Sequence, residues 1–408
     1  MPQDSVWYQA LGEIINESHL ATADDLVPIL ESACARLGLR LKLYLADLSQ
    51  RTLRGTDLAE DEPLTVDATV AGRAFRLTEI LPGHDAHGAA VLWVPVLDGT
   101  ERLGVVAMRL PADADPDDPA LRERCWTLAG LIGHLVVAKL PYGDLFHRVR
   151  RTVPLTVASE LLWQLLPPQT FACRDLVVAA TMERYDQVGG DGFDYAVDDS
   201  HAYLAVFDST GHDLAAGLIT TSVLAATRNA RRAGADLAGI AAAGDAVLSE
   251  HHPTAGFTTA VLATLDLSTG TLRYLLAGHP PPVLLRGGSV IKTLGVPPRL
   301  PLGLRRLQPG SGVSGAGVEH LEPGDRLLLH TDGVTEARDP DGVEFGIDRL
   351  VDLTERHEAA GLPAPETLRR ITHAVLDHQQ GTLQDDATLM LVEWSSTAAD
   401  SLLPETTR

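Results

Sequence analysis

The amino-acid sequence predicts an α+β protein that folds as more than one domain. Its 408 residues exceed the roughly 100–200 residues of an ordinary domain. Segments with apolar residues at helical spacing are interspersed with segments in which apolar and polar residues alternate, as in strands with one buried face. Two short turns between apolar runs predict β-hairpins, and therefore antiparallel strands. With 45% hydrophobic and 22% charged residues, the chain can bury sizeable cores.

The first 140 residues carry clear helix and strand patterns. Thr22 and Asp25 have the spacing of a capping box, and the apolar residues after them repeat at helical spacing until Gly38. In residues 39–45 every second residue is leucine, which predicts a strand with one buried face. Asp98-Gly99 predicts the turn of a hairpin. The other elements expected here are a short helix within residues 1–20, a helix over 65–77, strands over 89–97 and 102–110, and a helix over 121–135.

The segment over residues 141–168 has a helical pattern that prolines interrupt. These prolines are Pro141 and Pro154. A proline inside a helix removes a backbone donor and clashes with the preceding turn. We therefore expect a kinked or two-part linker helix.

Farther along, an alanine-rich helix is expected over residues 215–233, with a hairpin over 257–277 after it. Three arginines close the helix: Arg228, Arg231 and Arg232. They suit the negative end of a helix dipole, and a phosphate-binding role is the alternative.

Two aspartates stand beside glycines at the edge of an apolar strand. Asp191 follows Gly189-Gly190, and Asp208 follows the apolar run 202–207. Carboxylates on glycine-flanked turns suit a hard divalent cation such as Mg²⁺ or Mn²⁺. Aspartate is also common in ordinary turns, so this pair alone leaves both interpretations open.

The C-terminal third repeats the same context. Asp332 follows the apolar strand 326–330, and Asp385 precedes the apolar strand 389–394. If these strands share one core with those beside Asp191 and Asp208, four carboxylates converge. Such a cluster would repel itself and raise its own pKa values unless cations neutralise it.

Five ordered blocks carry a family resemblance: VGGD, FDSTGH, AGHPPP, TDGVTEARDPDG and DDAT. Over about residues 170–395 the chain resembles the bacterial metal-dependent protein phosphatases of the stage II sporulation protein E type, which are relatives of the type 2C serine/threonine phosphatases. The resemblance implies a sandwich of two mostly antiparallel sheets with helices outside. It also implies a pair of Mn²⁺ or Mg²⁺ ions, with the ligands Asp191, Asp208, Asp332, Asp385 and the backbone carbonyl of Ser209. The chain departs from the family pattern at Phe207 and Asp213, where glycine is usual.

The resemblance further implies hydrolysis of phosphoserine or phosphothreonine on a protein, typically an anti-sigma factor antagonist, by a metal-activated water. His212 is a candidate general acid or a structural hydrogen-bonding residue, and His279 matches a recurrent family position without an assigned role. The alternatives are an inactive binding module that sequesters a signalling partner, and a hydrolase of small phosphorylated molecules.

The N-terminal element order resembles a GAF domain, which implies a sensor of a small molecule or a protein signal; a dimerisation or spacer module is the alternative. Metal ligation by His84 and His87 is disfavoured, since lone histidines in a loop are mostly solvated. The expected domains are a GAF-like sensor domain over residues 1–140, a helical linker over 141–168 that controls the enzyme and can pair in a homodimer, a phosphatase domain over 169–395 and a disordered tail over 396–408.

The composition limits the partners. A net charge of −22 argues against nucleic acid and against anionic membranes. Three widely spaced cysteines, Cys34, Cys125 and Cys173, indicate buried thiols in a reducing compartment. No signal-peptide pattern opens the sequence and no apolar run approaches the roughly 20 residues of a membrane span. We therefore expect a cytoplasmic protein.

Overall fold

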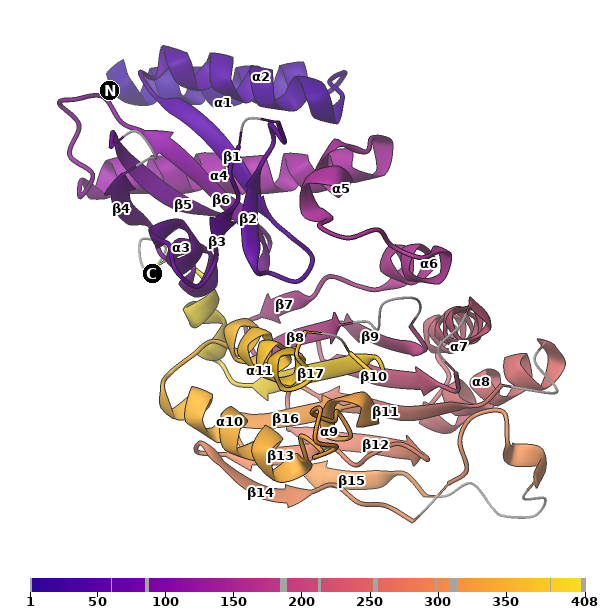
Figure 1. The fold of residues 1–408 in the computed structure, drawn as a ribbon. Coiled ribbons are helices and arrows are strands. Elements are labelled where there is room, and N and C mark those ends of the chain that lie inside the picture. The colour runs from indigo at the N-terminus through magenta and orange to yellow at the C-terminus, as the bar shows by residue number, and fades with distance from the viewer. Residues whose placement is uncertain are drawn as a thin grey trace. The chain divides into compact units, whose positions relative to one another are not determined.

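The structure is a computed structural model that describes residues 2–59, 61–84, 88–183, 189–211, 214–251, 256–297, 299–307, 315–381 and 383–404 (Figure 1). The chain divides into two compact units. The first comprises Met1–Pro154 and Asp400–Arg408, and the second comprises Leu155–Ala399.

The first unit is built on a six-stranded antiparallel sheet with the order β3-β2-β1-β6-β5-β4. Its strands are β1 (Arg40–Ala46), β2 (Thr52–Gly55), β3 (Leu64–Thr65), β4 (Leu81–His84), β5 (Ala90–Asp98) and β6 (Glu101–Arg109). Its helices are α1 (Pro2–Ser18), α2 (Ala23–Arg36), α3 (Val70–Leu77), α4 (Pro119–Lys139), the 3-10 helix η1 (Leu140–Tyr142) and α5 (Leu145–Arg150).

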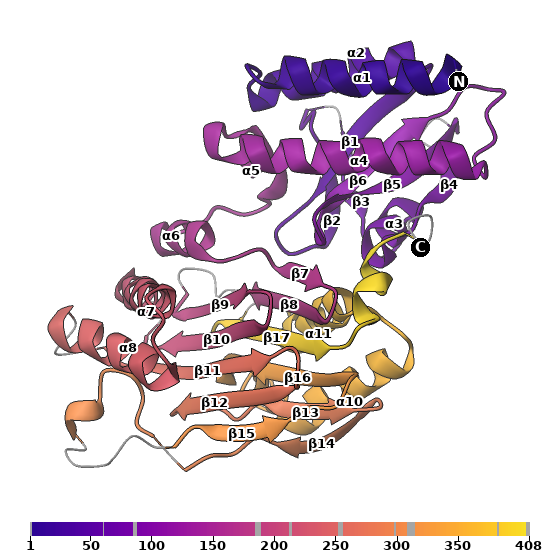
Figure 2. The ribbon, with the colours of Figure 1, turned by 180° about the vertical axis from the view of Figure 1, so that it is seen from behind.

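The two faces of this sheet are covered differently. Leu41, Leu43 and Leu45 of β1 pack in one core with α1, α2, α4 and α5, so the predicted alternation of this strand is confirmed. Figure 2 shows α1, α2 and α4 on that side. The other face carries a smaller core in which Ala71, Ala74 and Phe75 of α3 are buried.

Two helix predictions in this unit have different outcomes. The capping box is present, because the backbone amide of Thr22 donates to Asp25 Oδ2 at 2.9 Å and the Asp25 amide donates to Thr22 Oγ1 at 3.3 Å. The helix expected over 65–77 is shorter than predicted and begins at Val70. Thr69 caps it by accepting a hydrogen bond from the Gly72 amide at 3.0 Å, while Leu64–Thr65 pairs with β2 as a strand.

One segment among the described residues, Pro119–Tyr142, is long and apolar enough by composition to cross a membrane. It comprises α4 and η1. Cys125, Leu128 and Ile132 of α4 are nevertheless fully or almost fully buried in the core of the first unit. Only 33% of the apolar window is buried, so the core of this unit takes up part of the apolar surface of the segment.

The second unit consists of two antiparallel sheets, as expected from the resemblance. Their orders are β15-β12-β11-β10-β9 and β14-β13-β16-β17-β8-β7. The strands are β7 (Thr170–Cys173), β8 (Leu176–Glu183), β9 (Asp191–Val197), β10 (His201–Ser209), β11 (Thr258–Asp266), β12 (Thr271–Ala277), β13 (Val283–Arg286), β14 (Ser289–Thr293), β15 (Gly317–His320), β16 (Asp325–His330) and β17 (Ala387–Trp394). The helices are α6 (Val157–Leu165), α7 (Leu214–Arg232), α8 (Leu237–His251), η2 (Arg305–Leu307), α9 (Asp332–Thr335), α10 (Ile347–Ala359) and α11 (Ala364–His378).

A core between the two sheets joins residues of both, such as Leu204 and Val261 from one sheet and Leu329 and Met390 from the other. The outer face of the five-stranded sheet packs against α7 and α8, and α11 packs on β8 and β17 of the six-stranded sheet (Figure 1). The second unit is therefore a helix–sheet–sheet–helix sandwich, and the α+β class is confirmed.

Residues 141–168 do not form one helix. The 3-10 helix η1, α5 and α6 follow one another, and residues 151–156 separate α5 from α6. Pro154 lies in that break, as its missing amide donor requires. The tail predicted as disordered contains a short 3-10 helix, η3 (Ala398–Leu402), in which Leu402 is buried.

Candidate metal centre

Asp191 and Asp208 lie directly opposite each other on neighbouring strands. Asp191 is the first residue of β9, Asp208 is the last but one of β10, and the two are partners in the antiparallel register. Opposite residues in such a pair have Cβ atoms about 4.5–5.5 Å apart. The two carboxylates that the sequence places 17 residues apart are thus brought to one edge of the five-stranded sheet.

Asp332 and Asp385 come together at the corresponding edge of the six-stranded sheet. Asp332 opens α9 just after β16, and Asp385 lies two residues before β17, which pairs with β16. Gly333 permits this contact, because a Cβ at that position would lie 1.9 Å from the backbone oxygen of Asp386 and 3.5 Å from Asp385 Cβ. Any larger residue at position 333 would push these two turns apart.

Hydrogen bonds connect the two edges. Thr331 Oγ1 donates to Asp191 Oδ2 at 2.8 Å, and the Thr388 amide donates to Thr331 Oγ1 at 3.0 Å. Asp386 Oδ2 accepts from the Gly190 amide at 2.5 Å and, more weakly, from the Asp191 amide at 3.4 Å. The turn that carries Asp191 is therefore held by residues of the opposite sheet.

Thr331, Asp386 and Thr388 are functional candidates that the sequence reasoning missed. Each is buried and each adjoins a motif aspartate or belongs to the DDAT block. The signal available in the sequence was a threonine directly before Asp332 and a second aspartate directly after Asp385. Neither position reveals its partner, because that partner lies 140 residues away for Thr331 and 196 residues away for Asp386.

Ser209 packs tightly against the same turn. A Cβ on Gly190 would lie 2.4 Å from the Ser209 carbonyl oxygen, so glycine is required there. The Ser209 amide donates to the Gly190 carbonyl at 3.0 Å, and Ser209 Oγ lies 2.8 Å from the hydroxyl oxygens of Thr220 and Thr258. The side chain of Ser209 is thus engaged in the frame of the site, and its backbone carbonyl lies beside the Gly190–Asp191 turn.

The cluster is electrostatically strained without a counter-charge. Burial raises the pKa of Asp191 well above its ordinary value, and the negative charges of Asp208 and Asp386 raise it further. Burial likewise raises the pKa of Asp208 to about 7, with added contributions from Asp332, Asp385 and Asp386. A cation of high charge would remove both the repulsion and the desolvation cost.

The residues present fit divalent metal ions in donor type and in charge. Carboxylate and carbonyl oxygens are the donors that Mg²⁺ and Mn²⁺ prefer. Among the described residues, no group of three or more His, Cys, Asp or Glu side chains is close enough together to hold a metal ion. The fit therefore rests on the register of Asp191 and Asp208, on the mutual electrostatic effect of the aspartates and on their oxygen chemistry.

Phe207 lies away from this edge. It is fully buried in the core beneath α7 and α8, and neighbouring residues of a strand point to opposite faces. Its departure from glycine fills this core and leaves the side of the strand that carries Asp208 unchanged. His212 and Asp213 lie outside the described residues, as does His87.

Two buried histidines belong to a motif block or adjoin one: His279 lies in AGHPPP, and His330 precedes TDGV. Burial lowers the pKa of His279 to about 4 and also lowers the pKa of His330. His279 Nδ1 lies 3.1 Å from the carbonyl oxygen of Pro280, and Nε2 is buried with no hydrogen-bond partner among the described residues. His279 is therefore a buried part of the loop after β12.

The arginines of α7 have a structural partner. Arg228 Nη2 donates to Asp194 Oδ1 at 2.6 Å, and Arg231 Nη2 donates to Asp194 Oδ2 at 3.2 Å. Arg231 also lies 5.0 Å from the ring centroid of Tyr203. These two arginines hold α7 to the sheet, and Arg232 is exposed at the helix end.

The larger part of the second unit matches a known family model. Residues 198–395 match the family model described as Stage II sporulation protein E (SpoIIE). These residues, a little under half of the chain, are similar to the SpoIIE family. Asp208, Asp332 and Asp385 lie inside the match, whereas Asp191 precedes it and is placed at the site by the β9–β10 register.

Among curated proteins, Protein IcfG of Synechocystis sp. (strain ATCC 27184 / PCC 6803 / Kazusa) is 31% identical over 152 residues. That alignment covers 36% of this chain and 22% of IcfG, so the chain matches only about a fifth of that relative's length.

Similar solved structures include the RsbU and RsbW domains of Rv1364c from Mycobacterium tuberculosis, with 24% identity and a TM-score of 0.47 over 57% of this chain and 64% of that one. The SiaA-PP2C domain of Pseudomonas aeruginosa has 24% identity and a TM-score of 0.47 over 53% and 86% of the two chains. The catalytic domain of the serine/threonine protein phosphatase PstP, in complex with 2 manganese ions, has 20% identity and a TM-score of 0.37 over 54% and 99%.

Proposed function

We propose that the second unit is a metal-dependent protein serine/threonine phosphatase. Its metal ligands are Asp191, Asp208, Asp332 and Asp385 with the backbone carbonyl of Ser209, and they hold two Mn²⁺ or Mg²⁺ ions. The observation that carries the proposal is the pairing of Asp191 and Asp208 on neighbouring strands, where burial and the charges of nearby aspartates raise the pKa of both carboxylates. The match of residues 198–395 to the SpoIIE family supports it.

The chain's own residues do the positioning in this reaction. Thr331 fixes the orientation of the Asp191 carboxylate, and Asp386 holds the amides of the turn that precedes it. The chemistry that such ions supply is a nucleophilic water at neutral pH and neutralisation of the charge on the phosphate. The reaction therefore needs no side-chain nucleophile.

Cys34 gives no alternative nucleophile. Cys34 and Arg40 have the CxxxxxR spacing of cysteine-dependent phosphatases. Cys34 is nevertheless fully buried within α2 of the first unit, and burial raises its pKa to about 12. A reactive cysteine needs a lowered pKa and access to its substrate. Phosphatase activity that survives excess EDTA would contradict the proposed mechanism.

The proposed substrate is phosphoserine or phosphothreonine on a protein, of the kind found on anti-sigma factor antagonists. Support comes from the match to the SpoIIE family. The test is a manganese-dependent assay that compares a phosphorylated antagonist with a small phosphoester such as p-nitrophenyl phosphate. Turnover of the small ester alone would favour a hydrolase of small molecules, and metal binding without any turnover would favour a binding module.

We further propose that the segment over residues 141–168 regulates this activity, under the control of the first unit. The contact that supports this is the packing of α6 on α7, where a Cβ at Gly217 would lie 2.5 Å from Ala158 Cβ and 3.5 Å from the Gly189 carbonyl oxygen. A shift of α6 would therefore press on the turn that carries Asp191. A ligand or partner acts through this element only by favouring one of its arrangements.

The regulatory proposal is tested by comparing the full chain with a variant that begins at Leu155, which retains all of α6. Turnover and apparent Mn²⁺ affinity are measured for both, with and without cell extract as a source of signal. Equal values under both conditions would remove the first unit and the start of the linker from regulation.

A further inference from the structure

The last turn of α5 is held by an arginine of the neighbouring strand β2. The carbonyl groups at the end of a helix have no partner within that helix. Arg54 Nη1 donates to the Arg151 carbonyl at 2.7 Å and to the Val149 carbonyl at 3.1 Å. The Arg148 carbonyl lies 3.5 Å from the same nitrogen, at the limit for a hydrogen bond. The positive charge of Arg54 also suits the negative end of the helix dipole.

Other contacts fix the same part of α5 to the first unit. The Leu48 amide donates to the Arg150 carbonyl at 3.0 Å, and Arg150 Nε donates to the Ala46 carbonyl at 3.3 Å. Phe146 and Val149 are fully buried in the larger core of this unit. The end of α5 is therefore joined to the β1–β2 hairpin by polar contacts, in addition to the apolar packing of the helix.

Only a short connection separates the end of α5 from the second unit. Arg151 is the C-cap of α5, and Thr156 is the N-cap of α6, where it accepts a hydrogen bond from the first turn at 3.2 Å. Residues 152–155 lie between these two caps. Val153 is 65% exposed, and Pro154 has no amide donor. Arg54 thus contacts the residue from which this connection starts.

The position of Arg54 depends in turn on a buried carboxylate. A Cβ on the next residue, Gly55, would lie 1.8 Å from Asp61 Oδ2, so this carboxylate packs directly on the backbone of β2. Asp61 forms an ion pair with Lys42 of β1, and its side chain is 3% exposed. A buried charge that loses its partner is strongly destabilising. Loss of the ion pair would therefore move the Asp61 carboxylate away from Gly55 and disturb Arg54.

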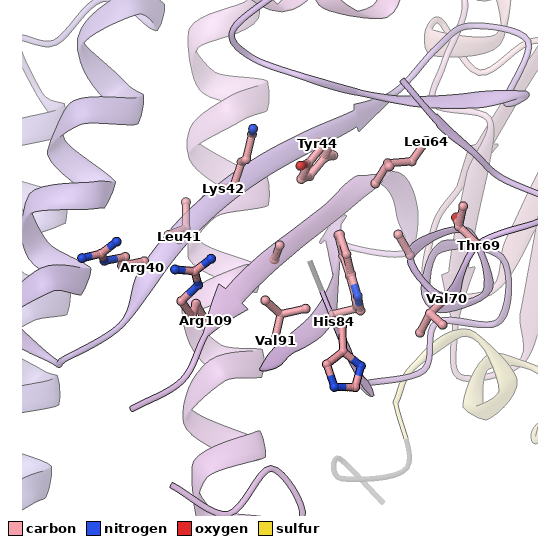
Figure 3. A pocket seen from close by; sticks show the side chains of 13 residues that line it. Arg40, Leu41, Lys42, Tyr44, Leu64, Thr69, Val70, His84, Val91 and Arg109 are labelled. Carbon is pink, nitrogen blue, oxygen red and sulfur yellow. The ribbon is translucent and has the colours of Figure 1, made fainter. Parts of the chain in front are cut away.

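Lys42 is the solvent-accessible member of this series of contacts. Its side chain is 49% exposed. It lines a cavity of about 500 Å³ on the face of the sheet that α3 covers in part (Figure 3). The contacts from Lys42 to Asp61, from Asp61 to Gly55 and from Arg54 to α5 all lie within the first unit. They connect this cavity with the start of the linker.

We propose that Arg54 is the positioning residue through which the first unit fixes the start of the linker, and that the ion pair of Lys42 and Asp61 controls Arg54. With these contacts in place, the last turn of α5 is closed and residues 152–155 start from a fixed point. Without them the turn opens. The inference rests on the regulation proposed above for residues 141–168, and it names the contact by which the first unit acts on that segment.

The first measurement is amide hydrogen exchange of residues 145–151 in the full chain. R54M removes the donor groups and keeps an apolar side chain, and it should speed exchange by about tenfold or more. R54K keeps a charged donor and should lie between R54M and wild type. K42M should speed exchange as well, and the K42M/R54M double variant should match R54M, because both changes act on one contact.

R73M is the matched control for these variants. Arg73 lies on α3 and forms an ion pair with Glu79, so its loss should leave exchange of residues 145–151 as in wild type. Unchanged exchange in R54M, or the same increase in R54M and R73M, would overturn the proposal. Additive effects of K42M and R54M would overturn the role of the ion pair.

Turnover separates this inference from the regulation on which it rests. A full chain with Gly-Ser-Gly-Ser in place of residues 152–155 uncouples the linker and keeps Arg54. This variant and R54M should shift the apparent Mn²⁺ affinity in the same direction, by about fivefold or more, whereas R73M should match wild type. A shift in the Gly-Ser variant but not in R54M would refute the role of Arg54 alone. No shift in either would refute regulation through the linker.

Discussion

Asp386 offers the sharpest test of how the two sheets build one centre. In D386A the buried amide of Gly190 loses its acceptor at 2.5 Å, and the longer bond from the Asp191 amide at 3.4 Å is lost as well. An unsatisfied buried donor costs about 1–3 kcal/mol. We assign most of this cost to the Gly190 amide, since the second bond is close to the limit for a hydrogen bond.

This cost should fall on the turn that positions Asp191. If metal binding requires the turn in its ordered form, about 1–3 kcal/mol corresponds to a rise of roughly 5- to 150-fold in the apparent dissociation constant for Mn²⁺. The turnover at saturating Mn²⁺ should fall much less, because Asp386 is assigned no contact with the ions. The assay is a Mn²⁺ titration of turnover, with the thermal midpoint of unfolding measured in parallel.

D386N separates geometry from charge. The amide oxygen can still accept from the Gly190 amide, although a neutral acceptor is weaker than a carboxylate. We therefore expect D386N to lie between wild type and D386A in Mn²⁺ affinity. D385N, by contrast, removes a proposed ligand and should lower turnover even at saturating Mn²⁺. The reasoning fails if D386A binds Mn²⁺ as wild type does, or if D386N is as damaging as D386A.

Three other predictions concern the same centre. D208N and D332N should each lower turnover by orders of magnitude at an unchanged fold, measured by phosphate release and circular dichroism, whereas D348N on the exposed face of α10 should behave as wild type. Without divalent cations, the free energy of unfolding should fall as pH rises from about 4 towards 7, because the Asp208 pKa of about 7 in the folded protein exceeds that of the unfolded chain. Urea unfolding at several pH values, with and without Mg²⁺, tests this. The same pH dependence with and without Mg²⁺ would contradict it. G217A should force α6 away from α7 and alter the apparent Mn²⁺ affinity. A158G added to G217A should restore that affinity. If the double variant has the same Mn²⁺ affinity as G217A, the contact between positions 158 and 217 is not the cause.

The sequence predicted local structure correctly where a pattern involves only residues that are close together in the chain. The capping box at Thr22, the alternation of β1 and the turn at Asp98-Gly99 each involve residues within a few positions of one another. The prediction was less complete for strands with little burial. In β14 four of five residues are exposed, so no alternation of apolar and polar residues marks the strand.

The candidate site divides in the same way. The sequence by itself predicted the fold class, which the structure confirms, and singled out the four aspartates as candidates, because each stands in a short motif beside an apolar strand. The tertiary structure alone decided what holds them: Asp386 accepts from an amide 196 residues earlier, and Thr331 donates to a carboxylate 140 residues earlier. It also decided that Arg228 and Arg231 bind Asp194, and that Arg54 donates to the end of α5. Periodicity and motifs report the environment of a residue along the chain, whereas strand register and the packing of two sheets choose its partner from anywhere in the sequence.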